Sequence, residues 1–197
     1  MNATSTWTIL DGAHSALRAA TAALTGADLG RPTPCSQWNV AQVLQHSAGD
    51  QLGYAAAITG QGGPPDDPFA PSGVLAGGPA ELVDPALAAS AAAFATVDPA
   101  GAVPTPLPQG ALPAATAAGA AALDAAVHAW DIAVATGRPS PLDEDLAAGL
   151  LPVAHAIVEP LRRYGVYAAA LEPSGAEGAP AQLLRYLGRD PHWTPAG

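Results

Sequence analysis

The apolar positions of this chain recur with the period of an α-helix. Five of them, three or four residues apart, predict a first helix over about residues 7–24: Leu10, Ala13, Leu17, Ala20 and Leu24. Ser36 or Asn39 can cap a second helix over about residues 40–59. The core stripe predicted for this second helix is Val40, Val43, Leu44, Ser47, Tyr54 and Ile58.

Capping signals place two further helices. Asp84 as the cap and Pro85 in the first turn predict a helix that runs to about Ala95. A longer helix is expected over about residues 114–136, because Gly137 suits the position just after a helix end. Both helices are rich in alanine, which favours helix formation and allows close packing.

The last third of the chain predicts a fifth helix from "SPLDEDLAAG", with acidic residues near its positive end. Pro152 and Pro160 predict a kink or an early end. A short helix is expected near residues 179–187, and "YGVYAAALEP" could form an extended piece. No convincing strand alternation is found, so we predict an all-α fold, an antiparallel bundle of four main helices with short additional ones.

Composition narrows the classes of protein. The 197 residues suggest one domain over residues 1–197. The chain has no lysine and a formal net charge of −10, which argues against nucleic acid or an anionic membrane as a partner. Its single cysteine, Cys35, excludes an internal disulfide, and "MNATSTWTILDG" lacks the features of a signal peptide. We therefore expect a cytoplasmic protein that acts on a small molecule.

Asp124, His128 and Asp131 follow one another at steps of four and three residues in "ALDAAVHAWDIAVATGRP". On an ideal helix they lie within about 60° of one another, beside the apolar stripe. A carboxylate and an imidazole four residues apart can hold one cation, as in the metal sites of helical bundles. They can equally form a helical charge pair, or His128 can be a hydrogen-bonded boundary residue.

A third ligand should come from another helix, and His46 in "VAQVLQHSAGD" is the best candidate. Two imidazoles and a carboxylate suit zinc with an open coordination position, and also Fe(II) or Ni(II). Asp131 could accept a hydrogen bond from a ligand histidine and orient its ring. It could equally cap a neighbouring helix or pair with Arg138, and such a structural role is favoured.

His155 and Glu159 repeat the four-residue spacing and form the rival metal pair, although the nearby prolines disturb regular geometry. Cys35 lacks the neighbours of a thiol enzyme, so a structural role is expected for it. Three arginines could contact an anionic substrate but are better explained as solvated surface groups: Arg18, Arg162 and Arg163. Nucleophile-elbow, P-loop and Rossmann glycine patterns are absent from the sequence.

Four stretches together resemble a known family: "TPCSQWNVAQVLQHSAGD", "LDAAVHAWDIAVATGRP", "PLDEDLA" and "LLRYLGRDPHW". The chain is similar to actinobacterial metal-binding proteins related to the N-terminal domain of mycothiol-dependent maleylpyruvate isomerase, within the DinB-like helical bundles. The resemblance implies a four-helix bundle that binds a divalent metal, usually zinc, through His46, Asp124 and His128. The isomerase has glutamate where this chain has the shorter Asp124.

The resemblance implies a metal-dependent enzyme, a mycothiol S-transferase or thiol-dependent isomerase acting on a small electrophile. One alternative is a metal Lewis-acid lyase, hydrolase or cyclase of a biosynthetic pathway. Another is a non-catalytic metal-binding bundle, and a third is a metal-free descendant that uses the same cavity. The sequence identifies no catalytic or substrate-contacting residue, nor any role for the connections at 60–80 and 97–113. Its alanine-rich faces permit a homodimer without requiring one.

Overall fold

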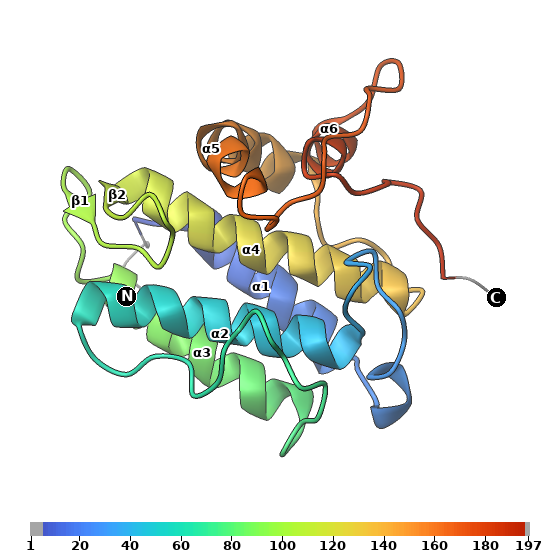
Figure 1. Cartoon of the computed structure of the whole chain (residues 1–197), viewed down its shortest axis with the longest axis horizontal. Coiled ribbons are helices and arrows are strands. Elements are labelled where there is room, and N and C mark those ends of the chain that lie inside the picture. The colour runs from blue at the N-terminus through green and yellow to red at the C-terminus, as the bar shows by residue number, and fades with distance from the viewer. Residues whose placement is uncertain (1–5, 196–197) are drawn as a thin grey trace, which may run out of the picture.

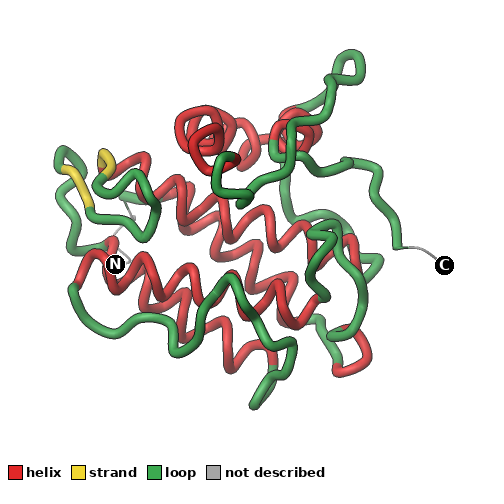
Figure 2. Tube along the Cα trace, viewed as in Figure 1, coloured by secondary structure: helices red, strands yellow, loops and turns green. Residues whose placement is uncertain are grey.

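The computed structural model describes residues 6–195 as a largely helical protein (Figures 1 and 2). This confirms the prediction of an all-α fold. The helices are α1 (Thr8–Ala22), α2 (Val40–Thr59), α3 (Pro79–Phe94), α4 (Ala114–Ala135), α5 (Glu144–Arg162) and α6 (Ala179–Tyr186), with a 3-10 turn at Gly26–Asp28.

Helices α1 to α4 form the bundle, and α5 and α6 form a further layer on it. Within the bundle α1 packs against α4, α2 packs against α3, and α2 also contacts α4. Figure 1 shows α5 and α6 nearly end-on beside α4, so they cross the bundle axis steeply. Because α2, α1 and α5 all pack against it, α4 is the interior helix of the molecule.

The position of α4 explains its composition. Nearly all of its side chains are buried, and most of these are alanine. Small side chains let neighbouring helices approach closely: a Cβ added at Gly119 would lie 2.5 Å from a methyl group of Val153 on α5. Among so many alanines, close helix packing does not explain the polar residues of α4, which are Asp124, His128 and Asp131.

Two predicted helix boundaries are wrong. Helix α3 begins at Pro79, five residues before Asp84, so that Pro79 lies in its first turn. Asp84 is therefore not a cap; its carboxylate accepts a hydrogen bond from Arg18 of α1 at 3.2 Å. Helix α5 does not end early at Pro152 or Pro160 but continues to Arg162, because its apolar face stays buried along its whole length. The alternative of a kink at these prolines stays a prediction.

The connection at 97–113 contains a two-stranded antiparallel sheet that the sequence did not predict. Strand β1 (Ala102–Val103) pairs with β2 (Leu112–Pro113), with Ala102 opposite Pro113. Each strand has only two residues, too few to show an alternating pattern. The extended piece expected in "YGVYAAALEP" is not a strand.

The connection between α2 and α3 lies against α2 and is held there by side chains of that helix. Gln42 donates to the carbonyl of Pro71 at 3.1 Å, and Gln45 donates to the carbonyl of Val74 at 3.0 Å. Gly73 donates its backbone N–H back to Gln45 at 2.7 Å. These bonds fix the segment that carries Pro68 and Phe69 over the middle of α2.

Among residues 6–195, no helix combines the length and the apolar character needed to span a bilayer.

Candidate metal centre

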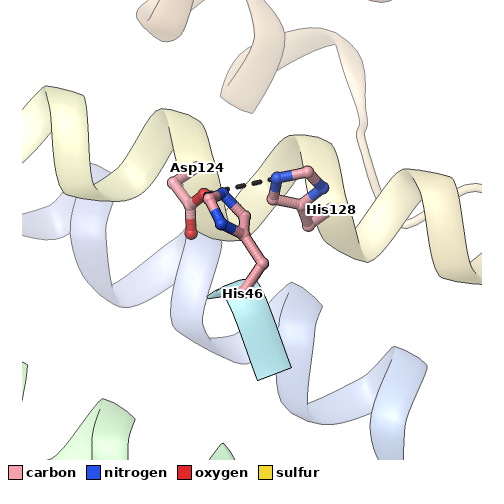
Figure 3. Close-up of side chains that lie close together, drawn as sticks. All are labelled: His46, Asp124 and His128. Carbon is pink, nitrogen blue, oxygen red and sulfur yellow. Dashed lines mark ion pairs between the residues drawn. The ribbon is translucent and has the colours of Figure 1, made fainter. Parts of the chain in front are cut away.

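Helices α2 and α4 bring three ligand-type side chains together where they cross. Asp124 and His128 lie one turn apart on α4, and His46 reaches toward them from α2 (Figure 3). The Asp124 Oδ1 atom lies 3.4 Å from Nε2 of His46 and 3.4 Å from Nε2 of His128. One ligand atom from each residue lies within 4.8 Å of the others, close enough for all three to hold one metal ion.

Hydrogen bonds orient both imidazoles. Nδ1 of His46 lies 2.9 Å from the carbonyl oxygen of Pro68. A carbonyl can only accept, so His46 carries a proton on Nδ1, and in the neutral ring its Nε2 lone pair faces the cluster. Nδ1 of His128 lies 2.8 Å from the carboxylate of Asp131, which imposes the same arrangement. Outer partners of this kind are typical of metal-ligating histidines.

Asp131 is itself held by an arginine from the far end of the chain. Arg189 donates two hydrogen bonds to the Asp131 carboxylate, at 2.9 and 2.8 Å, and Asp131 is fully buried. Burial raises the pKa of Asp131, but the charge of Arg189 and the hydrogen bonds from Arg189 and His128 outweigh it and lower the pKa to about 2. The His128 ring therefore rests on a carboxylate that is charged at neutral pH.

Sequence reasoning missed Arg189, although it stands in the quoted "LLRYLGRDPHW". The alternative that Asp131 pairs with Arg138 is wrong, since Arg138 contacts Asp28 at 3.4 Å. Arg189 lies 58 residues after Asp131, and no periodic pattern connects them. The one hint in the sequence was the presence of arginines near the end of the chain, any of which could pair with a buried carboxylate.

The electrostatics of the cluster favour a bound cation. Burial raises the pKa of Asp124, but the charges of His128 and His46 and the bonds from His46 and Ser47 outweigh it, so the pKa is lowered. Burial lowers the pKa of His46, but its hydrogen bond to Asp124 and the Asp124 charge raise it to about 9. A buried carboxylate between two imidazoles thus attracts positive charge, either as protons or as a metal ion.

The cluster forms part of the wall of a cavity of about 530 Å³. Aromatic rings of Trp38 and Phe69 flank His46, with ring centroids 4.5 and 5.3 Å from the imidazole. The segment after α5, including Tyr164 and Tyr167, also lines the cavity. A cavity of this volume has room for a small molecule beside the three ligand-type residues.

A family model described as the mycothiol maleylpyruvate isomerase N-terminal domain matches residues 10–133. The chain belongs to this family. This confirms the resemblance found in the sequence, and it makes the bundle DinB-like. The matched region of the maleylpyruvate isomerase N-terminal domain family contains all three ligand-type residues, while Arg189 and the segment after α5 lie outside it.

Two relatives from Mycobacterium tuberculosis, one in each of two strains, are 36% identical to this member of the family over 182 residues. The alignment covers 90% of this chain and 93% of each relative, and both are described as uncharacterized. No solved structure matches the chain. The alignment covers more of the chain than the family model does, so similarity to these relatives extends beyond residues 10–133.

The other residues considered from the sequence do not join the site. His155 is exposed and its ring packs on Tyr186, while Glu159 accepts a hydrogen bond from Arg162 at 2.9 Å. Cys35 lines the cavity, and burial raises the pKa of its thiol to about 11, which suits an inert thiol. Three arginines are absent from the cavity wall: Arg18, Arg162 and Arg163.

Proposed function

We propose that this protein is a divalent-metal-dependent enzyme that uses a low-molecular-weight thiol, mycothiol, to modify or isomerise a small electrophile. The observation that carries the proposal is the convergence of His46, Asp124 and His128 on the wall of a cavity large enough for a small molecule. The name of the family supplies the thiol and the class of reaction.

The donor set fits zinc with an open coordination position. Two neutral imidazoles and one carboxylate are a ligand set of catalytic zinc sites, whereas structural sites have four protein ligands. The orientation of both Nε2 atoms toward Asp124 supports this assignment, because Pro68 and Asp131 occupy the opposite ring nitrogens. Fe(II) and Ni(II) suit the same donors.

A divalent cation held here lowers the pKa of a thiol and so favours the nucleophilic thiolate at neutral pH. The residues of this chain provide the rest of the site. Asp131 and the Pro68 carbonyl hold the two imidazoles in one orientation, and Ser47 donates to the second oxygen of Asp124 at 2.7 Å. Trp38 and Phe69 pack against the His46 ring.

The experiment combines metal analysis with thiol transfer. The purified full chain is assayed with mycothiol and a panel of electrophiles, before and after removal of metal by a chelator and after its return. We expect conjugate or isomerised product only with metal present, and none from His128→Ala. If the metal-loaded protein leaves every electrophile unchanged, thiol transfer is excluded and a Lewis-acid lyase, hydrolase or cyclase becomes the better hypothesis.

A further inference from the structure

The cavity beside the three ligand-type residues continues along α4 toward the start of that helix. Ser47 donates to Asp124 at 2.7 Å, and Gln51, one turn later on α2, donates to the carbonyl of Ala121 at 2.9 Å. Helices α2 and α4 therefore run in opposite directions here. Ala120 lies one turn before Asp124, about 6 Å along the helix axis, and it also lines the cavity. The cavity thus extends at least one helical turn beyond the cluster.

Aliphatic side chains from three segments line this part of the cavity. Gly119 lies close to Val153, so α5 packs against this part of α4. Gln109 donates to the carbonyl of Ile157 at 3.1 Å and ties the connection at 97–113 to α5. We call the lining residues that these contacts bring together the apolar lobe: Leu107, Ala120, Leu123, Ile157 and Leu161.

The side chains of the apolar lobe offer neither a hydrogen bond nor a charge. Those on α4 and α5 belong to the hydrophobic core, with at most 3% of each residue exposed, and Leu107 is half-buried. Hydrocarbon placed against them gains free energy by leaving water. A charged group placed there would lose its hydration without finding a partner. The lobe therefore suits the apolar part of a ligand.

The rest of the cavity wall has no positive charge to spare. Arg189 is the sole arginine among the described residues that line it, and the chain has no lysine. Asp131 accepts two hydrogen bonds from that guanidinium and compensates its charge. Burial raises the pKa of Asp50 to about 7, and its carboxyl group adds no positive charge in either protonation state. A carboxylate on the substrate would thus find no counter-charge outside the metal position that the proposed function gives to the thiol.

We propose that the electrophile is an uncharged molecule whose apolar part lies in the apolar lobe while its reactive carbon faces the cluster of His46, Asp124 and His128. The inference rests on the proposed function and names the substrate class of the same site. The compound in the name of the family is of a different class, because maleylpyruvate is a dicarboxylate. Leu107 and Ile157 are then specificity-determining residues that favour apolar substrates over anionic ones.

The first test measures binding without a thiol. The full chain is loaded with Co(II), and the absorption spectrum of the metal reports the binding of hydroxamates, which ligate metals through oxygen. The probes share this head group and differ in the tail: acetohydroxamate has a methyl group, hexanohydroxamate a longer alkyl chain, and adipate monohydroxamate a similar chain that ends in a carboxylate. The variants are Leu107→Arg, which adds a cation to the lobe, and Val74→Arg, which adds the same charge at an exposed residue outside the cavity wall.

We expect the wild type to bind hexanohydroxamate about tenfold or more tightly than acetohydroxamate, because the added methylene groups leave water. Adipate monohydroxamate should bind about tenfold or more weakly than hexanohydroxamate, since its carboxylate has no partner. Leu107→Arg should largely remove this second difference, and Val74→Arg should leave it unchanged.

Three results would overturn the proposal. They are equal binding of the two long hydroxamates by the wild type, no gain from the alkyl chain, and equal effects of the two arginine variants. The wild-type comparison decides by itself if Leu107→Arg does not fold.

A second test uses turnover and separates this inference from the proposed function. N-Hexylmaleimide and 6-maleimidohexanoate share the same reacting double bond, and the second bears a carboxylate at the end of its chain. With metal and mycothiol, the protein should accelerate conjugation of N-hexylmaleimide about tenfold or more over that of the carboxylate, each relative to its reaction without protein. If neither is accelerated but the order of the hydroxamates holds, thiol transfer fails and the apolar lobe stands. If both are accelerated equally, thiol transfer stands and this inference is rejected.

Discussion

Helices α4 and α5 each carry a histidine and a carboxylate four residues apart, and the surroundings of these two pairs differ completely. On α4, Asp124 and His128 are nearly buried, and His46 of α2 reaches the same point. On α5, His155 is exposed and the Glu159 side chain is 61% exposed. Four-residue spacing places two side chains on one helix face, but a site also needs a second helix opposite that face.

The partners behind the two histidines differ as much as the pairs themselves. His128 is backed by Asp131, which Arg189 holds with two hydrogen bonds. The ring of His155 rests edge-on against Tyr186, a contact that does not fix which ring nitrogen carries a proton. The α4 pair is therefore preorganised for a cation, and the α5 pair is a surface arrangement.

The largest expected difference between the two helices is in metal content. Wild-type protein and His155→Ala should each hold about one divalent ion per chain, and His128→Ala should hold none, since two ligands do not make a tight site. Elemental analysis of the three purified proteins measures this directly. If His128→Ala retains its metal in full, the assignment of the α4 pair is wrong.

The next largest difference is in how much the carboxylates of the two helices contribute to the free energy of unfolding. Asp131→Ala leaves the buried Arg189 without a partner and should lower the free energy of unfolding by about 3–5 kcal/mol. Glu159→Ala breaks an exposed pair with Arg162 and should leave the urea midpoint nearly unchanged. Urea unfolding of metal-free protein at pH 7 gives both values.

A double variant distinguishes a charge effect from lost packing. Asp131→Ala combined with Arg189→Met removes the unpaired charge as well, so part of the lost stability should return. If the double variant is no more stable than Asp131→Ala, the ion pair between α4 and the C-terminal segment is not what stabilises this region.

Acid should lower the folding stability that the α4 site contributes, because Asp131 becomes protonated. Its pKa is about 2 in the folded protein against 3.8 ordinarily, so the carboxylate contributes stability above pH 3.8 that is lost as the pH falls through 2. The shift corresponds to about 2 kcal/mol. Unfolding of the wild type and Asp131→Asn, measured from pH 6 to pH 2, should show the gap between them narrowing by about that amount. A gap independent of pH would contradict the low pKa.

How far the sequence could predict the site depends on where each contact comes from. Periodicity placed Asp124 and His128 on one strip and made His46 the best third ligand from another helix, and the family resemblance implied the same three residues. The partners that orient them come from tertiary packing: Pro68 contributes a backbone carbonyl, which every residue has, and Arg189 arrives from 58 residues away. Contacts of this kind leave no local pattern.

The fold was predictable to a similar extent. Apolar periodicity and capping signals identified the helices. The capping signal misplaced the start of α3, because Pro79 and Pro85 offer the same starting signal six residues apart. Ser47 was assigned to the core stripe of α2 and is indeed buried, yet its hydroxyl donates to Asp124. The sequence therefore predicted the burial of Ser47 correctly, but it did not predict the hydrogen bond that Ser47 makes.

The smallest expected effect separates those two roles of a buried serine. Ser47→Ala removes the hydrogen bond to the second oxygen of Asp124 and should weaken metal binding by less than about tenfold, because one hydrogen bond contributes about 1 kcal/mol. Ser90 of α3 is the matched control: it is equally buried, and its hydroxyl has no hydrogen-bond partner in the described part of the chain. Ser90→Ala should leave metal affinity unchanged. Competition with a chromophoric chelator measures both, and equal losses from the two variants would mean that Ser47 acts through packing alone.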